Sequence, residues 1–319
     1  MENRKPKISV VLPVYNEEGN VDVVYAELKK TLSSAGKGYE IIFVDDGSSD
    51  GSLERIKKLS FSDPAVRYVS LSRNFGHQNA IFAGMTEARG QAVISMDADM
   101  QHPPALISEM IKLWEEGNEI VYTTKEEYKL PPVKHFVIKT SYWFISRMSG
   151  LELRFGQSDF RLIGRKALDV LLTMPEYHKF LRGQVKWVGF RQKALPYKVE
   201  PRHSGVPKYS YETLYKLAMD GIFSFGRYPL HLVMMFNILI FFISAVYITF
   251  VFVNRILHMM GLPHVPIVLG WTTVVMSIFL LGSIQLMAIG ILSEYVGRIY
   301  DQTKNRPVFI VKDKSNGEK

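Results

Sequence analysis

Two acidic residues one position apart, Asp97 and Asp99, follow a short apolar run and are themselves followed by Gln101. Carboxylate and amide oxygens are the ligands that Mg²⁺ and Mn²⁺ prefer in proteins. We therefore expect Asp97, Asp99 and Gln101 to hold Mg²⁺ or Mn²⁺ beside a diphosphate, where the ion would neutralise the charge of a leaving group. An Asp-x-Asp triplet alone is weak evidence, because such triplets occur by chance in loops. Its weight depends on its neighbours.

Three further polar clusters each follow a predicted strand, at 15–18, 45–50 and 73–76. Within residues 1–125, short apolar runs alternate with helical patterns, which is typical of a parallel sheet covered by helices on both faces. The predicted strands are 8–13, 40–45, 66–71, 92–97 and 120–123, and the predicted helices are 21–34, 52–59, 78–87 and 104–115. Ligands bind outside the carboxyl ends of the strands in such sheets, so we expect one shared site there.

Two long stretches, 228–254 and 256–293, contain no Asp, Glu, Lys or Arg. About 20 apolar residues span a bilayer as a helix, so we predict two transmembrane helices at roughly 230–253 and 266–291, with buried core helices as the alternative. Only Arg255 lies between them, whereas the outer flanks carry several basic residues. The positive-inside rule then places both termini in the cytoplasm. The basic residues of the flanks are Lys208, Lys216, Arg227, Arg298, Lys304 and Arg306. We expect no signal peptide, because a strand-like run follows at once after residue 7.

Basic charge is concentrated before the first predicted span. Residues 1–130 carry 15 Lys and Arg against 20 Asp and Glu, whereas residues 131–227 carry 17 against 7. Such a segment suits anionic lipid headgroups or a phosphate-bearing lipid; nucleic acid is the usual competitor, but here the segment leads directly into a membrane anchor. Amphipathic patterns at 131–150 and 209–226 predict helices that lie in the membrane interface or pack on the core. The chain has no cysteine, which excludes disulfides and thiolate metal sites and fits a reducing compartment.

The segments 11–18, 44–51 and 96–101 together resemble those of the family-two glycosyltransferases of the GT-A fold, over roughly residues 7–200. With Leu71-Ser72-Arg73-Asn74-Phe75-Gly76-His77-Gln78 and two C-terminal spans added, the chain resembles the polyprenyl-phosphate glycosyltransferases. That group includes dolichol-phosphate-mannose synthases and bacterial bactoprenol glucosyltransferases. The resemblance implies an α/β GT-A domain with a mostly parallel, Rossmann-like sheet at 1–208. A juxtamembrane helix at 209–228, two transmembrane helices at 229–293 and a cytosolic tail at 294–319 would follow.

The resemblance also implies which residues bind the nucleotide-sugar. Asp46 would hydrogen-bond the base, although it could instead form a turn beside Gly47, and Asn16 could be a helix N-cap. Arg202 would grip a phosphate with its two-pronged guanidinium and Lys208 would add a compact charge, unless both belong to the general basic patch. Pro207 stands where the family commonly has Ser. The full expected set is Pro13, Tyr15, Glu17, Val44, Asp46, Asp97, Ala98, Arg202 and Lys208.

The segment 157–162 is similar to the one that supplies a carboxylate near the acceptor, so Asp159 joins Asp99 and Arg202 as a catalytic candidate. Two roles for Asp159 stay open. It could accept a residual proton from a lipid phosphate, whose second pKa of about 6 leaves it mostly dianionic, or it could form an ion pair with Arg161 or another arginine. The scattered His77, His135, His178 and His203 show no metal-ligand spacing and receive no role in the chemistry.

These features predict a membrane enzyme that moves one sugar from a nucleotide-sugar to a polyprenyl phosphate, with inversion, at the cytoplasmic face of a cell inner membrane. Glucose from UDP-glucose and undecaprenyl phosphate are the expected substrates; mannose from GDP-mannose or a formylated amino-pentose from UDP are alternatives. Processive synthases usually carry Gln-x-x-Arg-Trp, which the segment 184–187 does not match. A non-catalytic nucleotide-sugar sensor is the alternative of another class, and the acidic residues argue against it. The sequence leaves the lipid length and a homo-oligomer open.

Overall fold

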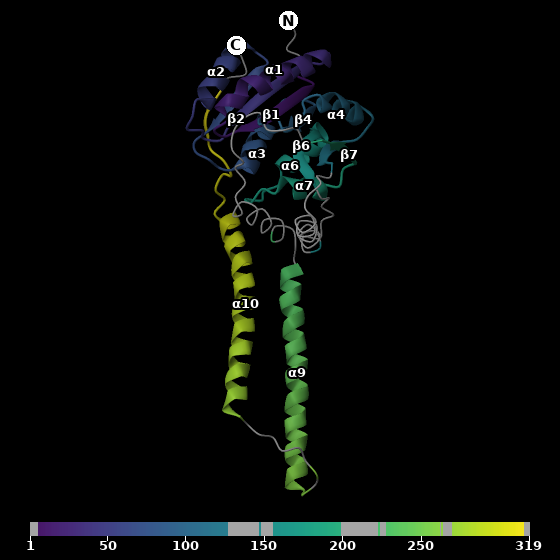
Figure 1. Ribbon diagram of the computed structural model, residues 1–319, viewed down its shortest axis with the longest axis vertical. Coiled ribbons are helices and arrows are strands. Elements are labelled where there is room, and N and C mark those ends of the chain that lie inside the picture. The colour runs from purple at the N-terminus through teal and green to yellow at the C-terminus, as the bar shows by residue number, and fades with distance from the viewer. Residues whose placement is uncertain are drawn as a thin grey trace.

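The computed structural model describes residues 6–126, 156–198, 228–261 and 270–315, together with the single residues 147, 223 and 263. An α/β domain lies at one end of the molecule, and two long helices extend from it (Figure 1). The strands are β1 (Ile8–Val14), β2 (Tyr39–Asp45), β3 (Val66–Leu71), β4 (Ala92–Ser95), β5 (Ile120–Lys125), β6 (Gln157–Gly164), β7 (Gln192–Tyr197) and β8 (Val311–Lys314). The helices are α1 (Glu18–Ser34), α2 (Ser52–Ser62), α3 (His77–Glu87), α4 (Leu106–Glu115), α6 (Arg165–Leu172), α7 (Leu181–Trp187), α9 (Tyr228–Met259) and α10 (Trp271–Thr303).

The described strands form one sheet in the order β7-β5-β6-β4-β1-β2-β3-β8. Strands β4, β1, β2 and β3 pair in parallel, as do β5 and β7. Strand β6 runs antiparallel to both β4 and β5, and β8 runs antiparallel to β3. The predicted α/β class with a mostly parallel sheet is therefore confirmed. The carboxyl ends of β1, β2 and β4 meet at one edge, as the sequence predicts.

Apolar side chains on both faces of the sheet hold the helices in place. Val10 and Leu12 of β1 pack with α1, α2 and α4 on one face, whereas Val11 packs with α3, α6 and α7 on the other. Successive side chains of a strand point to opposite faces, so a strand buried on both sides must be apolar throughout. All seven residues of β1 are buried. This explains why the first strands are continuous apolar runs in the sequence.

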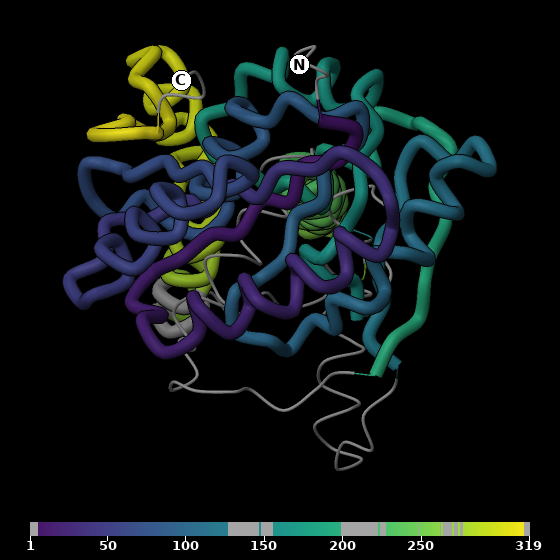
Figure 2. Tube along the Cα trace, turned by 90° about the horizontal axis from the view of Figure 1, so that it is seen from above, coloured from purple at the N-terminus to yellow at the C-terminus, as the bar shows by residue number. Residues whose placement is uncertain are grey.

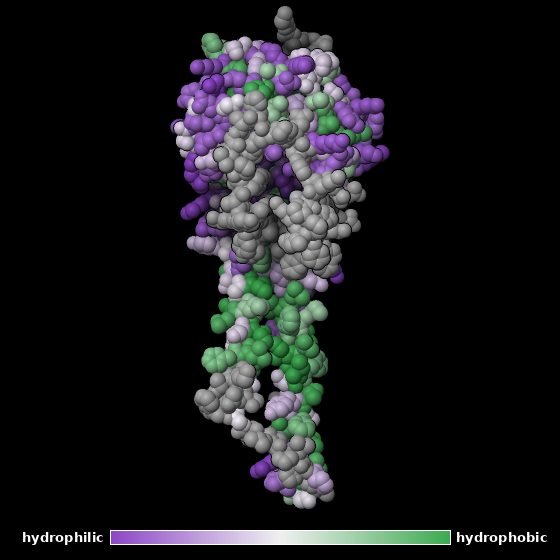
Figure 3. Space-filling model, in the orientation of Figure 1, coloured by the Kyte–Doolittle hydropathy of each residue, from purple (hydrophilic) through white to green (hydrophobic). Residues whose placement is uncertain are grey.

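The structure contains two long apolar helices, α9 and α10, where the sequence predicted two membrane spans. Neither is buried inside the molecule, which overturns the alternative of core helices. Their large apolar side chains face outward, with Phe241 68% and Phe279 71% exposed, and the apolar surface is concentrated on this part of the molecule (Figure 3). At about 1.5 Å per residue, each helix is longer than the roughly 30 Å that a bilayer core requires.

The helix bounds differ from the predicted spans. Helix α10 begins at Trp271 rather than at 266 and continues to Thr303, beyond the predicted end at 291. Helix α9 continues to Met259, so Arg255 lies in its last turns rather than in a connecting loop. The predicted helices at 131–150 and 209–226 lie largely outside the described residues.

The segment after α10 returns to the α/β domain and joins its sheet. Strand β8 pairs with β3, and the ring of Phe309 meets the ring of Phe82 on α3 at 6.4 Å between centroids. Just before it, the Gln302 amide donates to the carbonyl of Pro175 and accepts from the N–H of Tyr177, both at 2.7 Å. Seen along the long axis, α10 lies beneath the side of the domain that carries this segment (Figure 2). The sequence predicted only a polar tail here.

Candidate active site

Hydrogen bonds tie the loop after β1 to the loop after β2. Asn16, at a positive φ of 51°, accepts from the N–H of Ser49 at 2.8 Å and donates its own N–H to the Ser48 hydroxyl. Glu17 is the N-cap of α1 and no side chain caps that helix, so the N-cap interpretation of Asn16 is wrong. The turn after β2 is held by Asp45, whose Oδ1 accepts from the N–H of Ser48 at 3.1 Å. The turn-forming aspartate is therefore Asp45 rather than Asp46.

Asp46 instead anchors the loop that leads into α3. Its two carboxylate oxygens accept from the main-chain N–H groups of Phe75 and Gly76 at 2.7 and 3.0 Å. Burial raises the pKa of Asp46, and the two N–H donors oppose that rise. Gly76 has φ 94°, a conformation that favours glycine. The Asp46 side chain is buried, so the loop 75–76 and the start of α3 are held against the end of β2.

The Asp-x-Asp segment turns sharply after β4. Met100 has φ 65°, an uncommon conformation for a residue other than glycine, and the N–H of Gln101 donates to Asp99 Oδ1 at 3.1 Å. Asp97 Oδ1 is buried and has no hydrogen-bond partner among the described residues. An unpartnered carboxylate oxygen beside a second carboxylate and an amide is a donor set that fits a hard divalent cation. The three predicted metal ligands thus lie on one turn and fit such an ion.

The buried side chain of His102 holds this turn in place. Its Nδ1 accepts from the N–H of Asp97 at 3.2 Å, which places the ring proton on Nε2, and Nε2 lies 2.7 Å from the Ser158 hydroxyl on β6. Burial lowers the pKa of His102, so the ring is neutral near pH 7. His102 therefore links the end of β4 to β6. No role could be predicted for His102 from the sequence, because a lone histidine in a loop carries no pattern.

Asp159 on β6 lies at the centre of an ion-pair network. Its Oδ1 is 2.9 Å from Arg161 Nη2 and 3.0 Å from Arg182 Nε, and its Oδ2 is 2.8 Å from Arg182 Nη2. Burial favours the neutral carboxyl, but the charges of Arg182 and Arg161 outweigh it and hold the pKa of Asp159 well below its usual range. Burial also lowers the pKa of the Arg161 guanidinium, to about 10. Arg182 on α7 was not singled out by the sequence.

The side chains of His77 and Gln78, the first two residues of α3, also lie close to Asp159. Gln78 Nε2 donates to Asp159 Oδ2 at 3.1 Å. His77 Nε2 lies 3.8 Å from that oxygen and 3.4 Å from Asp97 Oδ1. The sequence analysis assigned His77 no role in the chemistry, yet the fold places it between the two carboxylates. Only the pairing of β4 with β6, which the sequence did not predict, brings these carboxylates together.

The residues predicted to bind the nucleotide are distributed around the ends of β1, β2 and β4. Tyr15 follows β1 and is 39% exposed. The Glu17 carboxylate accepts a hydrogen bond from the Asn20 amide. Pro13, Val44 and Ala98 are buried, and the Val44 side chain packs in the hydrophobic core. Arg202 and Lys208 lie outside the described residues.

The site thus combines an acidic turn that fits a divalent cation, adjoining loops at parallel strand ends and a fixed carboxylate on the neighbouring strand. Residues 9–172 match the family described as Glycosyl transferase family 2. The chain belongs to this family, and it is a glycosyltransferase with the GT-A fold that the sequence predicts. Membership of this family therefore shows that the chain is an enzyme and rejects the alternative of a non-catalytic nucleotide-sugar sensor.

Several relatives match this chain over nearly their whole length. A bactoprenol glucosyl transferase derived from the SfII prophage of Shigella flexneri is 34% identical over 98% of this chain and 99% of its own. A prophage bactoprenol glucosyl transferase homolog of Escherichia coli K12 is 32% identical over 96% and 98%. YkcC of Bacillus subtilis, named an uncharacterized glycosyltransferase, is 38% identical over 97% and 94%.

A solved structure also shows a distant likeness. It is the mannosyltransferase PcManGT of Pyrobaculum calidifontis in complex with GDP-Man and Mn²⁺, at 17% identity and a TM-score of 0.46, covering 69% of this chain and 63% of that one. This likeness is too remote to inform the ligands of the site.

Proposed function

We propose that this chain transfers one glucose from UDP-glucose to undecaprenyl phosphate, with inversion at the anomeric carbon. The observation that carries the proposal is the similarity to bactoprenol glucosyl transferases along the whole chain, at 34% identity over 98% of it, spans included. A sugar transferase that shares only the α/β domain would not be expected to share the membrane hairpin as well. Mannose or an amino-pentose as the transferred sugar remain the alternatives that the test below separates.

In the proposed reaction an oxygen of the lipid phosphate attacks the anomeric carbon. The bond from that carbon to the β-phosphate oxygen of UDP breaks, and UDP leaves with the bonding electron pair. The attacking phosphate is mostly dianionic near pH 7, so no proton needs to be removed from it. Positioning and electrostatic stabilisation are then the main contributions expected from the protein.

Asp97, Asp99 and Gln101 are the residues that would hold Mg²⁺ or Mn²⁺, and a bound cation would stabilise the charge that develops on the departing UDP. Asp159 would orient rather than deprotonate, because its paired carboxylate is a very weak base. It holds Arg182 by two hydrogen bonds and so fixes that guanidinium near the reacting groups. Arg202 and Lys208 are proposed to contact phosphates of the donor and acceptor.

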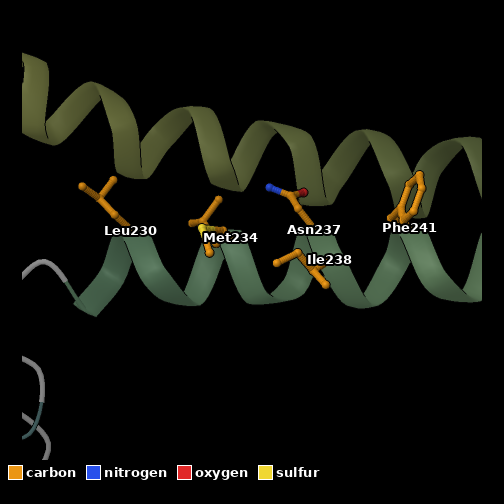
Figure 4. Close-up of a pocket in the computed structure, with 6 residues that line it drawn as sticks. Leu230, Met234, Asn237, Ile238 and Phe241 are labelled. Carbon is orange, nitrogen blue, oxygen red and sulfur yellow. The ribbon is translucent and has the colours of Figure 1, made fainter.

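The membrane hairpin offers a place for the lipid chain of the acceptor. A hollow of about 410 Å³ lies along the first turns of α9, next to the α/β domain, and is lined by Leu230, Val233, Met234, Asn237, Ile238 and Phe241. Figure 4 shows Asn237 and Phe241 on the side of α9 that faces α10. A polar amide within a span usually faces another helix or a ligand rather than lipid. We propose that the polyprenyl chain lies in this hollow.

The two helices associate the enzyme with a membrane, and we propose the cell inner membrane with the catalytic domain and both termini in the cytoplasm. Nucleotide-sugars are made in that compartment, so the proposed orientation gives the site its donor. The placement of β8 on the catalytic sheet supports a C-terminus on the same side as the domain.

The test uses the purified full-length protein in lipid nanodiscs. It is incubated with undecaprenyl phosphate and, in separate reactions, UDP-glucose, UDP-N-acetylglucosamine, GDP-mannose and a UDP-linked formylated amino-pentose, each with Mg²⁺ or Mn²⁺. Mass spectrometry of the lipid fraction should show undecaprenyl-phosphoglucose from UDP-glucose alone, and NMR of its anomeric proton should show the β configuration. A lipid product from another donor only would replace the sugar, and no lipid product from any donor would reject the proposal.

A further inference from the structure

Among the described residues, three buried side-chain nitrogen or oxygen atoms that have no hydrogen-bond partner lie together in the candidate site. These three are His77 Nε2, Gln78 Oε1 and Asp97 Oδ1. Buried polar atoms are bonded in the large majority of cases, so a cluster of exceptions calls for an explanation. A bound polar group that completes their hydrogen bonds supplies one.

The distances show that these atoms lie close together. His77 Nε2 is 3.4 Å from Asp97 Oδ1 and 3.8 Å from Asp159 Oδ2. Gln78 donates its Nε2 to that same Asp159 oxygen at 3.1 Å, which leaves the other atom of its amide group, Oε1, beside it. The three atoms therefore lie where the end of β4, the strand β6 and the first turn of α3 come together.

The fold holds these side chains at that place. Asp46 fixes the main chain of Phe75 and Gly76, and α3 begins at the next residue, His77. Gln78 is fixed at its other end by Asp159, which is itself paired with Arg182. The unpartnered atoms thus belong to side chains that the surrounding contacts hold in place, rather than to mobile side chains on the surface.

The chemistry of the free atoms selects the kind of ligand. Gln78 Oε1 can only accept hydrogen bonds, and His77 Nε2 accepts or donates according to its tautomer. Asp97 Oδ1 is the oxygen proposed to hold the cation. A phosphate dianion offers acceptors only and would be repelled by the carboxylates of Asp97 and Asp159. Hydroxyl groups both donate and accept, so a ring that carries several hydroxyls satisfies both His77 Nε2 and Gln78 Oε1.

We propose that His77 and Gln78 bind hydroxyl groups of the transferred sugar and so determine which sugar the enzyme accepts. The proposal rests on the proposed function in that it takes a nucleotide-sugar as the donor. A site built to bond a hydroxyl discriminates strongly against a sugar in which that hydroxyl is missing or differently placed, because its buried polar atoms then stay unpaired.

The experiment compares His77→Ala and Gln78→Ala with the wild type and with Thr86→Ala, a control at the exposed far end of the same helix. Isothermal titration of the full-length protein in nanodiscs, with Mn²⁺ present, measures the Kd of UDP and of UDP-glucose, UDP-galactose and UDP-N-acetylglucosamine. We expect UDP affinity to stay within about twofold of wild type, whereas affinity for the preferred UDP-sugar falls about tenfold, the size expected for one hydrogen bond. The preference among the sugars should narrow correspondingly. Thr86→Ala should match the wild type throughout.

His77→Ala is the sharper variant, because His77 Nε2 makes no hydrogen bond to the described residues and its loss should leave the fold intact. Equal weakening of UDP and UDP-sugars would assign the pair to the nucleotide or to structure and overturn the proposal. So would unchanged affinities, or a wild type that binds no UDP-sugar more tightly than UDP. The titration contains no undecaprenyl phosphate, so failure to transfer sugar to that lipid would reject the proposed function without affecting this result.

Discussion

Arg182 closes a two-point ion pair on Asp159, with Nε 3.0 Å from Oδ1 and Nη2 2.8 Å from Oδ2. The two residues are 23 positions apart, on β6 and α7, and the side chain of Asp159 is only 6% exposed. A second guanidinium, that of Arg161, approaches Oδ1 as well. The carboxylate is therefore a fixed anion that holds two cations, and the interpretation of Asp159 as an ion-pairing residue fits this geometry better than a role as a base.

This relationship predicts how Asp159→Asn depends on pH. The pKa of Asp159 is held below its usual range, so the carboxylate is ionised throughout pH 6–8 and should contribute equally at both ends of that range. Asp159→Asn should lose most transfer activity, by a factor that hardly changes between pH 6 and pH 8. The control is Asp169→Asn, an exposed aspartate on α6, which should be neutral. Recovery of activity at pH 8 would instead support the base role.

The same pair should stabilise the fold above the ordinary pKa of aspartate. A lowered folded-state pKa contributes stability at neutral pH that is lost as the pH falls below about 4. Removing one partner of a buried ion pair costs about 3–5 kcal/mol, so Asp159→Asn should lower the free energy of unfolding by that order at pH 7. The difference from wild type should shrink as the pH is lowered, which denaturant titrations at pH 7 and pH 3.5 can measure.

Asp46 should act through the loop that it anchors. Asp46→Asn leaves one oxygen for two N–H donors, because the amide nitrogen cannot accept a bond from Gly76 or Phe75. We expect a loss of about 1–3 kcal/mol in the free energy of unfolding and at least about a tenfold fall in kcat/KM for UDP-glucose. Asp22→Asn, a change at an exposed position of α1, serves as the control. Normal stability would contradict the anchoring role, and normal kinetics would contradict the proposed contact with the base.

The sequence predicted the strand ends and helices of residues 1–125 well, because buried parallel strands and amphipathic helices have distinct apolar patterns. Helix α1 begins three residues before its predicted start and α2 ends three residues after its predicted end. Strand β4 ends at Ser95 rather than Asp97, since the N–H of Asp97 bonds to His102 instead of a neighbouring strand. Contacts that depend on the order of the strands were not predictable. The pairing of β6 with β4 and the return of β8 bring together residues far apart in the chain.

In the candidate site, too, some residues could be predicted from the sequence and others could not. Asp97 and Asp99 could be named because their residue types and their position after a strand suggest chemistry, and Asp159 because the segment 157–162 is similar to the one that supplies the family's acceptor-side carboxylate. Arg182 could not, since a helix in a basic segment offers no reason to select one arginine. His77 was passed over because its partners, Asp97 and Asp159, become its neighbours only after the sheet has formed.

Activity should require a divalent cation held by the Asp-x-Asp turn. Asp99→Asn should abolish transfer while the protein stays folded and membrane-bound, because the amide oxygen can still accept the hydrogen bond from the N–H of Gln101. Circular dichroism and flotation with liposomes check the fold and the membrane binding, and titration with Mn²⁺ and Mg²⁺ after EDTA treatment checks the requirement. Asp63→Asn, at the far end of α2, is the control. Full turnover in EDTA would remove the cation from the mechanism.

Arg202 and Lys208 should contact phosphates. Arg202→Ala should lower kcat/KM at least about tenfold, since a hydrogen bond to a charged group contributes about 1.5–3 kcal/mol. Lys208→Ala should have a smaller effect, because a single ammonium lacks the two-pronged geometry of a guanidinium. Lys198→Ala, a change at an exposed lysine of the same basic segment, should leave the kinetics unchanged. Wild-type kinetics for all three variants would contradict the phosphate contacts. Arg202 and Lys208 would then belong to the general basic patch that attracts anionic lipid.

Both termini should lie in the cytoplasm. Strand β8 hydrogen-bonds to β3 of the catalytic sheet, so the C-terminus and the catalytic domain must lie on one side of the membrane, and the connection between α9 and α10 on the other. A green fluorescent protein fused after Lys319 should fluoresce, whereas alkaline phosphatase at the same position should be inactive. Alkaline phosphatase inserted at Met260, just after α9, should be active, because it would reach the oxidising side. The opposite pattern would place the catalytic domain away from its nucleotide-sugar and overturn the orientation.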